Sequence, residues 1–373
     1  MKRIGLFCLS LCLIITFMLS ALPVFAEKTA NNNTVIYGAH SVDGQVPVLG
    51  SDRLVTNVQS AIIYETKSQT LMYAFNADEQ VYPASLVKIL TALMVAERAN
   101  LSDAVTVKEE TLQTVTYDAV SADLLANEVM TVEDLLYCMM VGSANDAAAV
   151  LAEHISGTQS AFVEEMNRYA ADLGCIQTNF TNVHGLHDEM QYTTVRDMAR
   201  ILAKAMENQV FCKVFGAVYY KVPATNLSEE RSLSTGNYLM NNDSVEIYHD
   251  SRVTGGRTAV TSAGYRSIAT SAEHNGMQLI CISTGSQSVY KEDGYTVQIF
   301  GGYNETSMLL NFGFEGFQAK QVVYEGQAGE QYAVENGTSD VVAGATDSVY
   351  TVLPNEVGID HLEYRLTKSD DTV

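Results

Sequence analysis

The stretch Tyr82-Pro83-Ala84-Ser85-Leu86-Val87-Lys88, continued by Ile89-Leu90-Thr91-Ala92-Leu93-Met94-Val95-Ala96-Glu97, is the segment around which the rest of the chain is organised. Pro83 and Ala84 suit the first turn of a helix, where a missing N–H costs nothing. Between positions 86 and 96 only Lys88 and Thr91 are polar. A helix that is apolar on every side belongs inside a core. The segment therefore predicts a buried helix that begins with a serine and a lysine.

Ser85 and Lys88 are three residues apart, so they lie on one face of this helix. A lysine at the start of a buried helix is costly unless its charge is partnered or lost. Beside a hydroxyl, such a lysine can be a base that activates a serine nucleophile. A second Ser-x-x-Lys, Ser288 to Lys291, lies in a polar, glycine-containing run, and we take it as a chance match in a loop.

Residues 1–26 have the features of an export signal. Lys2 and Arg3 give the charged start, Ile4 to Leu22 the apolar run, and Val24-Phe25-Ala26 a small-residue cleavage site. We expect an exported, extracytoplasmic protein that is cleaved near Ala26. An uncleaved membrane anchor is the alternative, because the apolar run is long. No other membrane anchor is evident in the sequence.

Composition excludes several classes of protein. The chain has 373 residues, of which 47% are hydrophobic, which is incompatible with a disordered chain. Without the signal, 20 basic residues stand against 44 acidic ones, a net charge of −24, which argues against nucleic acid and anionic membranes as partners. The remaining cysteines are widely spaced and are expected to be mostly buried free thiols: Cys138, Cys175, Cys212 and Cys281.

The hydrophobic pattern predicts an α+β fold, with a sheet covered by helices and an additional all-α region. Two hairpins are expected, one from Ser60–Tyr64 and Thr70–Ala74, the other from Gly264–Ser271 and Met277–Thr284. Helices are expected at 131–140, 146–155, 158–173, 194–208 and 295–312, with Ser143 or Asn145 capping the second.

The same pattern predicts the domain boundaries. After the signal at 1–26, residues 27–57 form a polar leader. Residues 58–315 form the main domain. Residues 316–373 consist of short β-like runs separated by glycines, and we expect a small β-rich domain, or part of one.

Two further motifs carry chemistry. Ser143-Ala144-Asn145 falls between two predicted helices, where a hydroxyl and an amide can point into a cleft, although in isolation an ordinary helix cap is the favoured interpretation. Gly256-Arg257-Thr258-Ala259-Val260 leads into the second hairpin, where an edge strand with a solvated arginine is the alternative.

The order and spacing of the three motifs resemble the serine penicillin-recognising enzymes, with their Ser-x-x-Lys, Ser-x-Asn and Lys-Thr-Gly motifs. The surrounding sequence resembles the low-molecular-weight D-alanyl-D-alanine carboxypeptidases over residues 61–312. The segments that carry this resemblance are Tyr82–Lys88, Gly142–Ala148, Asn182–His187, Gln191–Ala199 and Ala263–Tyr265. It implies a β-lactamase/transpeptidase-like fold, no cofactor and no metal. The implied partners are peptidoglycan stem peptides ending in D-Ala-D-Ala and β-lactam antibiotics.

The resemblance also assigns roles to residues. Ser85 is the expected nucleophile, and Lys88 is the expected base, with its pKa lowered by burial and by Arg257. The other expected roles are proton transfer to the leaving D-Ala by Ser143, binding of the substrate amide by Asn145, a grip on the terminal carboxylate by Arg257 and Thr258, and an oxyanion hole from the backbone N–H groups of Ser85 and Val260.

This chain departs from the family in the third motif, where Arg257-Thr258-Ala259 replaces Lys-Thr-Gly. Arginine keeps the positive charge and offers a planar fork that suits a carboxylate, but it cannot accept a proton at neutral pH. Ala259 adds a methyl group where glycine lets a substrate approach the strand. The chain also ends without the apolar anchor that the family often carries.

Three alternatives remain at this point. A serine β-lactamase would share the acylation step, but we find no Glu-x-x-Leu-Asn stretch for fast deacylation. A non-catalytic muropeptide sensor would fit the altered third motif, yet the serine, lysine and asparagine of the other motifs are intact. Zinc binding by His184, His187 and Asp188 lacks a further ligand at a recognised spacing, so a structural loop is expected there.

Overall fold

The computed structural model describes residues 24–26, 54, 57–243, 245–332, 341–345, 347–355, 358 and 362–364. The expected signal and polar leader therefore lie almost entirely outside the described residues. The exceptions are Leu54, Asn57 and β1 (Val24–Ala26). Strand β1 pairs in parallel with β17 (Leu362–Tyr364).

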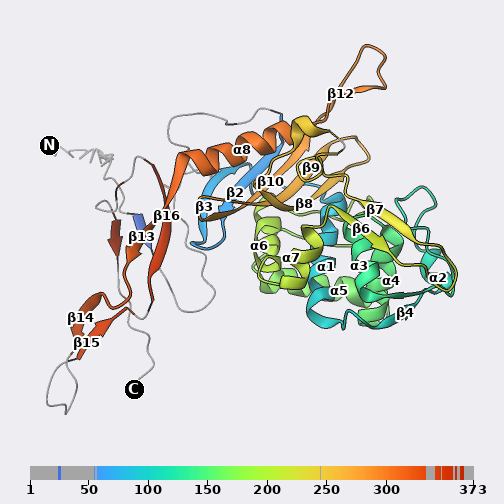
Figure 1. The fold of residues 1–373 in the computed structure, drawn as a ribbon, viewed down its shortest axis with the longest axis horizontal. Helices are drawn as coiled ribbons and strands as arrows, with labels where there is room; N and C mark the ends of the chain where they lie inside the picture. Colours follow the sequence, from blue (N-terminus) through green and yellow to red (C-terminus); the bar gives the residue numbers. More distant parts are fainter. Residues whose placement is uncertain are drawn as a thin grey trace, which may run out of the picture.

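A five-stranded antiparallel sheet in the order β3-β2-β10-β9-β8 forms the centre of the molecule (Figure 1). Both predicted hairpins are confirmed. The first is β2 (Ser60–Glu65) with β3 (Thr70–Phe75), and the second is β9 (Arg266–His274) with β10 (Met277–Ser286). β10 joins them by pairing with β2, and β8 (Val253–Val260) forms the edge next to β9.

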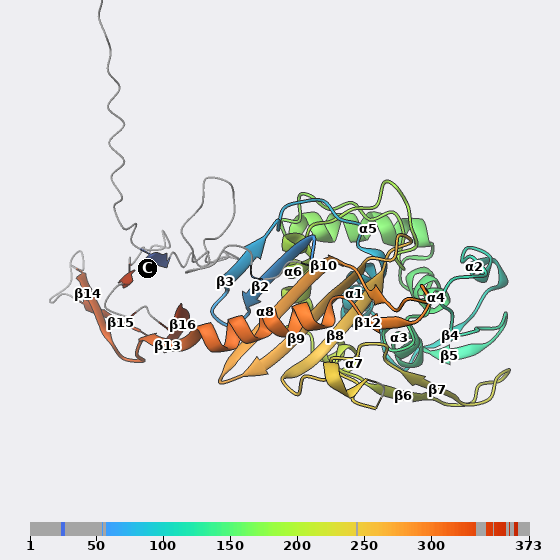
Figure 2. The same ribbon diagram turned by 90° about the horizontal axis from the view of Figure 1, so that it is seen from above.

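Alternating side chains of the sheet enter two separate cores, as expected for a sheet covered on both faces. Ile62 and Ile280 face the helical region, whereas Ile63 and Leu279 face α8 (Tyr303–Gly316). Figures 1 and 2 show α8 lying across one face of the sheet and the remaining helices gathered on the other side.

The helical region surrounds α1 (Val87–Arg98), in which every residue from Val87 to Val95 is buried. This confirms the prediction of a core helix. The other helices of this region are α2 (Glu109–Leu112), α3 (Val132–Met140), α4 (Asn145–Ser156), α5 (Gln159–Asp172), α6 (Val195–Ala205) and α7 (Gln209–Phe215). Short pairs flank them: β4 (Ala104–Thr106) with β5 (Val129–Thr131), and β6 (Tyr219–Val222) with β7 (Arg231–Ser234).

Side-chain caps fix several helix starts. Thr131, Thr158 and Thr194 each accept a hydrogen bond from the backbone N–H three residues on, at the starts of α3, α5 and α6. The predicted cap of α4 was wrong, because the N-cap residue is Ala144 and neither Ser143 nor Asn145 caps with its side chain. Those two polar side chains accept hydrogen bonds instead, Asn145 from Lys88 and Ser143 from Arg257.

Two other helix predictions need correction. The sequence pattern gave no signal for α7. The last helix was expected from 295 but begins at Tyr303, because Val297–Ile299 forms strand β12 against β11 (Val289–Tyr290). The carboxylate of Asp293 accepts the N–H groups of Tyr295 and Thr296, which fixes a turn where the helix was expected.

Beyond α8 the chain forms two further antiparallel pairs, at the opposite end of the sheet from the helical region in Figure 1. They are β13 (Phe317–Val323) with β16 (Val349–Pro354), and β14 (Ala328–Tyr332) with β15 (Val341–Gly344). The cysteines of the described residues, Cys138, Cys175, Cys212 and Cys281, are free thiols. None of the helices described is long and apolar enough to cross a membrane.

Candidate active site

A short helical turn, η1 (Ala84–Leu86), leads into α1 and places Ser85 one turn before Lys88. The Lys88 side chain has 0% of its surface exposed. Its Nζ lies 2.6 Å from Asn145 Oδ1, 2.6 Å from the carbonyl oxygen of His184 and 3.4 Å from Ser85 Oγ. The predicted serine and lysine therefore meet, and an asparagine of the second motif meets them.

The environment of Lys88 favours the neutral amine. Burial lowers the pKa of Lys88 well below its usual value, the Arg257 cation lowers it further, and the Asp146 carboxylate acts in the opposite direction. A neutral amine close to a hydroxyl can accept its proton. This matches the behaviour expected of an activating base.

Arg257 connects the three motifs. Its side chain is 5% exposed and faces the helical region. The guanidinium donates to the carbonyl oxygens of Met140 at 2.8 Å and Ser85 at 3.4 Å, and to Ser143 Oγ. Burial lowers the pKa of Arg257 to about 10, so this group remains a cation at neutral pH. The donors of the guanidinium thus already point to groups of the protein.

The backbone at Ser143 supports this contact. Ser143 has a φ of 63°, which is uncommon for a residue other than glycine. In this conformation its hydroxyl oxygen accepts a hydrogen bond from the Arg257 guanidinium. Ala84, directly before the expected nucleophile, has a φ of 44°. Unusual backbone conformations of this kind are concentrated at functional sites.

Thr258 and Val260 alternate with Arg257 and Ala259 along β8, the edge strand of the sheet. Ala259 packs in the core of the helical region, so Thr258 and Val260 belong to the opposite face. A cleft of about 400 Å³ is lined by residues 82–85, 118–120, 185–188 and 260–262, with Asn145 and Gln191. Ser85 and Asn145 therefore border the cleft, while Lys88 lies behind Ser85.

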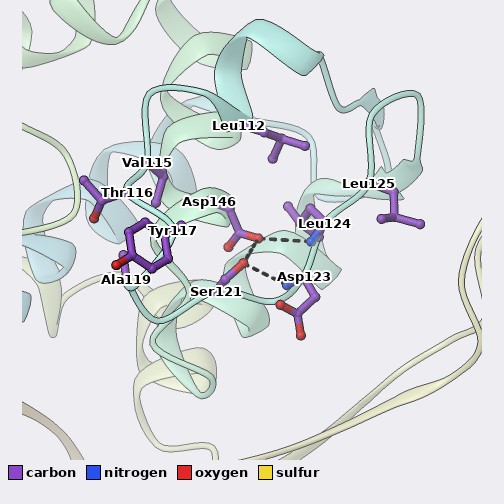
Figure 3. A pocket seen from close by; sticks show the side chains of 10 residues that line it. All are labelled: Leu112, Val115, Thr116, Tyr117, Ala119, Ser121, Asp123, Leu124, Leu125 and Asp146. Carbon is purple, nitrogen blue, oxygen red and sulfur yellow. Dashed lines mark hydrogen bonds between the residues drawn. The ribbon is translucent and has the colours of Figure 1, made fainter.

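Asp146 organises the loop on one side of this cleft. Its carboxylate accepts Ser121 Oγ at 2.6 Å and the N–H groups of Ala122 at 3.0 Å and Leu124 at 3.1 Å. Figure 3 shows Ser121, Leu124 and Asp146 converging at a neighbouring pocket of about 330 Å³. The sequence analysis missed this role, because the carboxylate serves mostly backbone groups, which carry no side-chain signal.

The segment around His184 closes the site from the other side. His184 offers its carbonyl oxygen to Lys88, and its Nδ1 accepts the N–H of Leu186 at 3.2 Å. His187 packs edge-on against Tyr82, with ring centroids 5.0 Å apart. Among the residues that the structure describes, no cluster of His, Cys, Asp or Glu could hold a metal ion. The segment was expected to be structural, but its direct bond to Lys88 could not be foreseen.

We expect Gly185→Ala to destabilise the protein by about 3 kcal/mol and to reduce activity. Gly185 has a φ of +90°, and a Cβ there would lie 1.9 Å from Ala84 O and 2.8 Å from Ser85 N. Urea unfolding gives the change in free energy. Gly174→Ala is the matched control, since Gly174 has a φ of +76° but nothing within 4 Å of an added Cβ. The control should lose only about 1–2 kcal/mol, and equal losses would contradict the close approach.

His184 predicts a pH dependence of stability. Burial, with a smaller contribution from Lys88, lowers its pKa from 6.5 to about 3. Between these values the unfolded chain binds a proton that the native state does not, so stability falls as the pH drops from 6.5 towards 3. In His184→Asn this fall should be shallower by up to about 1.4 kcal/mol per pH unit. Urea unfolding at several pH values measures it. The exposed His187, changed to Asn, is the control, and identical slopes in His184→Asn and wild type would contradict the prediction.

Comparison with known proteins decides the family. The family model for D-alanyl-D-alanine carboxypeptidase matches residues 51–288. The chain belongs to the D-alanyl-D-alanine carboxypeptidase family. It is 30% identical over 330 residues to a relative from Haemophilus influenzae named D-alanyl-D-alanine carboxypeptidase DacA, covering 86% of this chain and 78% of the relative. A Bacillus subtilis relative, D-alanyl-D-alanine carboxypeptidase DacF, is 25% identical over 81% of this chain and 74% of its own length.

Solved structures agree with this membership. Penicillin binding protein 5 from Haemophilus influenzae superposes with a TM-score of 0.68 at 29% identity, covering 82% of this chain and 85% of that one. As a D-alanyl-D-alanine carboxypeptidase family member, the chain is a serine-type hydrolase with the transpeptidase-like α+β fold that the sequence analysis predicted.

Proposed function

We propose that the protein removes the terminal D-Ala from peptidoglycan stem peptides ending in D-Ala-D-Ala, through an acyl-enzyme on Ser85, and that penicillins acylate the same serine. One observation carries this proposal above the rest. A fully buried lysine amine lies within reach of a serine hydroxyl at the edge of a cleft. Desolvation of that amine supplies a base without a histidine or a metal ion.

The reaction would proceed in two displacements. Ser85 Oγ attacks the carbonyl carbon between the two D-Ala residues, and its proton passes to Lys88 Nζ. The C–N bond then breaks, and the proton held by Lys88 is relayed through the Ser143 hydroxyl to the amine of the departing D-Ala, which leaves Ser143 protonated and Lys88 neutral. Water attacks the resulting ester, which releases the shortened peptide and restores the Ser85 hydroxyl.

Substrate binding would use the remaining motif residues. Asn145 would hold the substrate amide, and Thr258 would contact the terminal carboxylate. The backbone N–H groups of Ser85 and Val260 would stabilise the oxyanion, where each donor is typically worth about 10²–10³-fold in rate. Arg257 would serve this site through its bonds to Ser143 and to the Ser85 carbonyl.

We also propose the location and domain plan given by the sequence. Residues 1–26 would direct export and be cleaved near Ala26, residues 27–57 would form a leader, and the enzyme would act outside the cytoplasmic membrane, where its wall substrate is. Residues 58–315 would form the catalytic domain. The change from α8 to the paired strands after Gly316 supports a second, β-rich domain over 316–373.

The direct test is to incubate the mature protein with a peptide ending in D-Ala-D-Ala and to assay free D-Ala. We expect release of one D-Ala per peptide and a long-lived covalent adduct with labelled penicillin. Binding of the peptide without D-Ala release would instead indicate a sensor. An adduct that lasts only seconds would indicate a β-lactamase, which the carboxypeptidase names of the relatives do not favour.

A further inference from the structure

The proposed reaction does not use one buried carboxylate next to the cleft. Asp146 lies in the first turn of α4 and has 3% of its surface exposed. A buried carboxylate is costly unless hydrogen-bond donors or a cation surround it. Its oxygens accept the hydroxyl of Ser121 and the N–H groups of Ala122, Leu124 and Ala147, at 2.6–3.1 Å. Three of these four donors belong to the loop of residues 118–124, so the carboxylate chiefly binds this loop.

The same loop is attached a second time, through the residue that precedes Asp146. The backbone N–H of Asn145 donates to the carbonyl oxygen of Val120 at 2.8 Å. The side-chain oxygen of Asn145 accepts from Lys88 Nζ at 2.6 Å. One residue thus joins the loop to the amine that is expected to activate Ser85. Since α4 begins at Asn145, a displacement of the loop would be passed on to this contact.

Hydrogen bonds contribute more than packing to the position of loop 118–124. Residues 118–120 line the cleft, and other residues of the same segment line the neighbouring pocket (Figure 3). The loop is therefore a wall between two hollows. Within residues 118–124, all of which the structure describes, only Ala122 and Leu124 are buried. These are the two residues of the loop whose N–H groups bond to Asp146.

We propose that Asp146 is a positioning residue of the reaction, which clamps loop 118–124 to the start of α4 and so fixes one wall of the cleft together with Asn145. This rests on the proposed function and deepens it. Asp146 is not among the residues that line the cleft, so it acts through the loop and Asn145 rather than by contact with the peptide. A wall that is already in place limits the entropy lost on binding, so its loosening should raise KM.

The charge of Asp146 has a second effect, on the base. Among the described residues, the charged groups that act on Lys88 are Arg257 on β8, which lowers its pKa, and Asp146 on α4, which raises it. His184, whose carbonyl oxygen accepts from Lys88, has a pKa of about 3 and is neutral above that pH. A neutral side chain at position 146 should lower the pKa of Lys88 further, so the rise of the acylation rate with pH should begin at a lower pH.

The test begins with Asp146→Asn, which keeps the size of the side chain but removes its charge. It should lower kcat/KM for a peptide ending in D-Ala-D-Ala about 10–100-fold, mostly through a higher KM, because hydrogen bonds to a charged acceptor are lost. The rise of its acylation rate should move to lower pH.

Asp123→Asn is the matched control for this change. Asp123 is an exposed aspartate of the same loop that lines the neighbouring pocket but not the cleft. Asparagine also tolerates the φ of 55° at this position. The control should keep kcat/KM within about two-fold of wild type, with an unchanged pH profile.

Ser121→Ala separates the clamp from the charge, because it removes one donor and leaves the carboxylate. We expect a loss of about three- to ten-fold in kcat/KM and an unchanged pH profile. Labelled penicillin counts the active sites in each sample, so an unfolded fraction is not mistaken for a kinetic effect. If Asp146→Asn does not fold, Ser121→Ala still decides.

Three outcomes would overturn this inference and leave the proposed function standing. They are wild-type kcat/KM in Ser121→Ala, wild-type kcat/KM in a folded Asp146→Asn, and a loss in Asp146→Asn with an unchanged pH profile, which would indicate a structural role alone. Wild-type protein that releases no D-Ala would instead overturn the proposed function.

Discussion

Ser85→Ala is expected to lower the rate of D-Ala release on the order of 10⁶-fold, the effect of removing the nucleophile in subtilisin. The same change should abolish covalent labelling by penicillin, because no other hydroxyl in the described part of the chain lies one turn before a buried lysine amine. Residual peptide binding should persist, since the cleft and the Asn145 side chain remain. The measurements are a D-Ala assay and intact-protein mass spectrometry after incubation with penicillin.

Ser288→Ala is the matched control for this experiment. Ser288 opens the other Ser-x-x-Lys match, and its Oγ accepts the N–H of Gly301 next to an exposed two-residue strand. We expect this variant to keep full activity and full labelling. A penicillin adduct that persists in Ser85→Ala would place the nucleophile elsewhere in the chain.

Lys88→Ala should slow acylation about 10²–10⁴-fold, the usual contribution of a positioned general base. Removal of the amine also leaves Asn145 Oδ1 and the His184 carbonyl without their donor, so some loss of stability is expected as well. Burst kinetics with a chromogenic β-lactam separate acylation from later steps. Lys291→Ala, in the loop match, is the control and should acylate at the wild-type rate.

The pH profile distinguishes a catalytic role of Lys88 from a structural one. Because the pKa of Lys88 is lowered, its free amine forms at a lower pH than in an ordinary lysine, and the acylation rate of the wild type should rise as pH rises through that pKa. Lys88→Ala should lose this rise. A variant that is slow but keeps the same pH profile would show that another group accepts the proton.

Much of the fold follows from local signals. Short strand-like apolar runs on either side of polar turns predicted the two hairpins, and Thr131 and Thr158 marked helix starts, because a threonine cap acts within one turn. The start of α8 was predicted wrongly because strand β12 depends on its pairing with β11, which no local pattern reveals. The register of β10 between β2 and β9 is likewise a tertiary property.

In the candidate site, too, some features could be predicted from the sequence and others could not. The spacing of Ser85 and Lys88 on a buried helix could be read directly, because both lie within one turn. The partners of Lys88 and Arg257 could not, since the carbonyl oxygens of His184 and Met140 belong to the backbone, which is the same in every residue. Packing with the helical region decides which face of β8 Arg257 occupies. Because neighbouring residues of a strand point to opposite faces, Thr258 then lies on the other face.

The position of β10 in the sheet has a consequence for the order of events during synthesis. The hairpin of β2 and β3 leaves the ribosome early, but its neighbour in the sheet is completed only at Ser286. Until then β2 has an uncovered edge, and Arg257 on β8 has no finished sheet from which to reach Ser143. A partly made chain therefore carries its serine and lysine without the completed sheet, so assembly of the candidate site requires translation at least as far as Ser286.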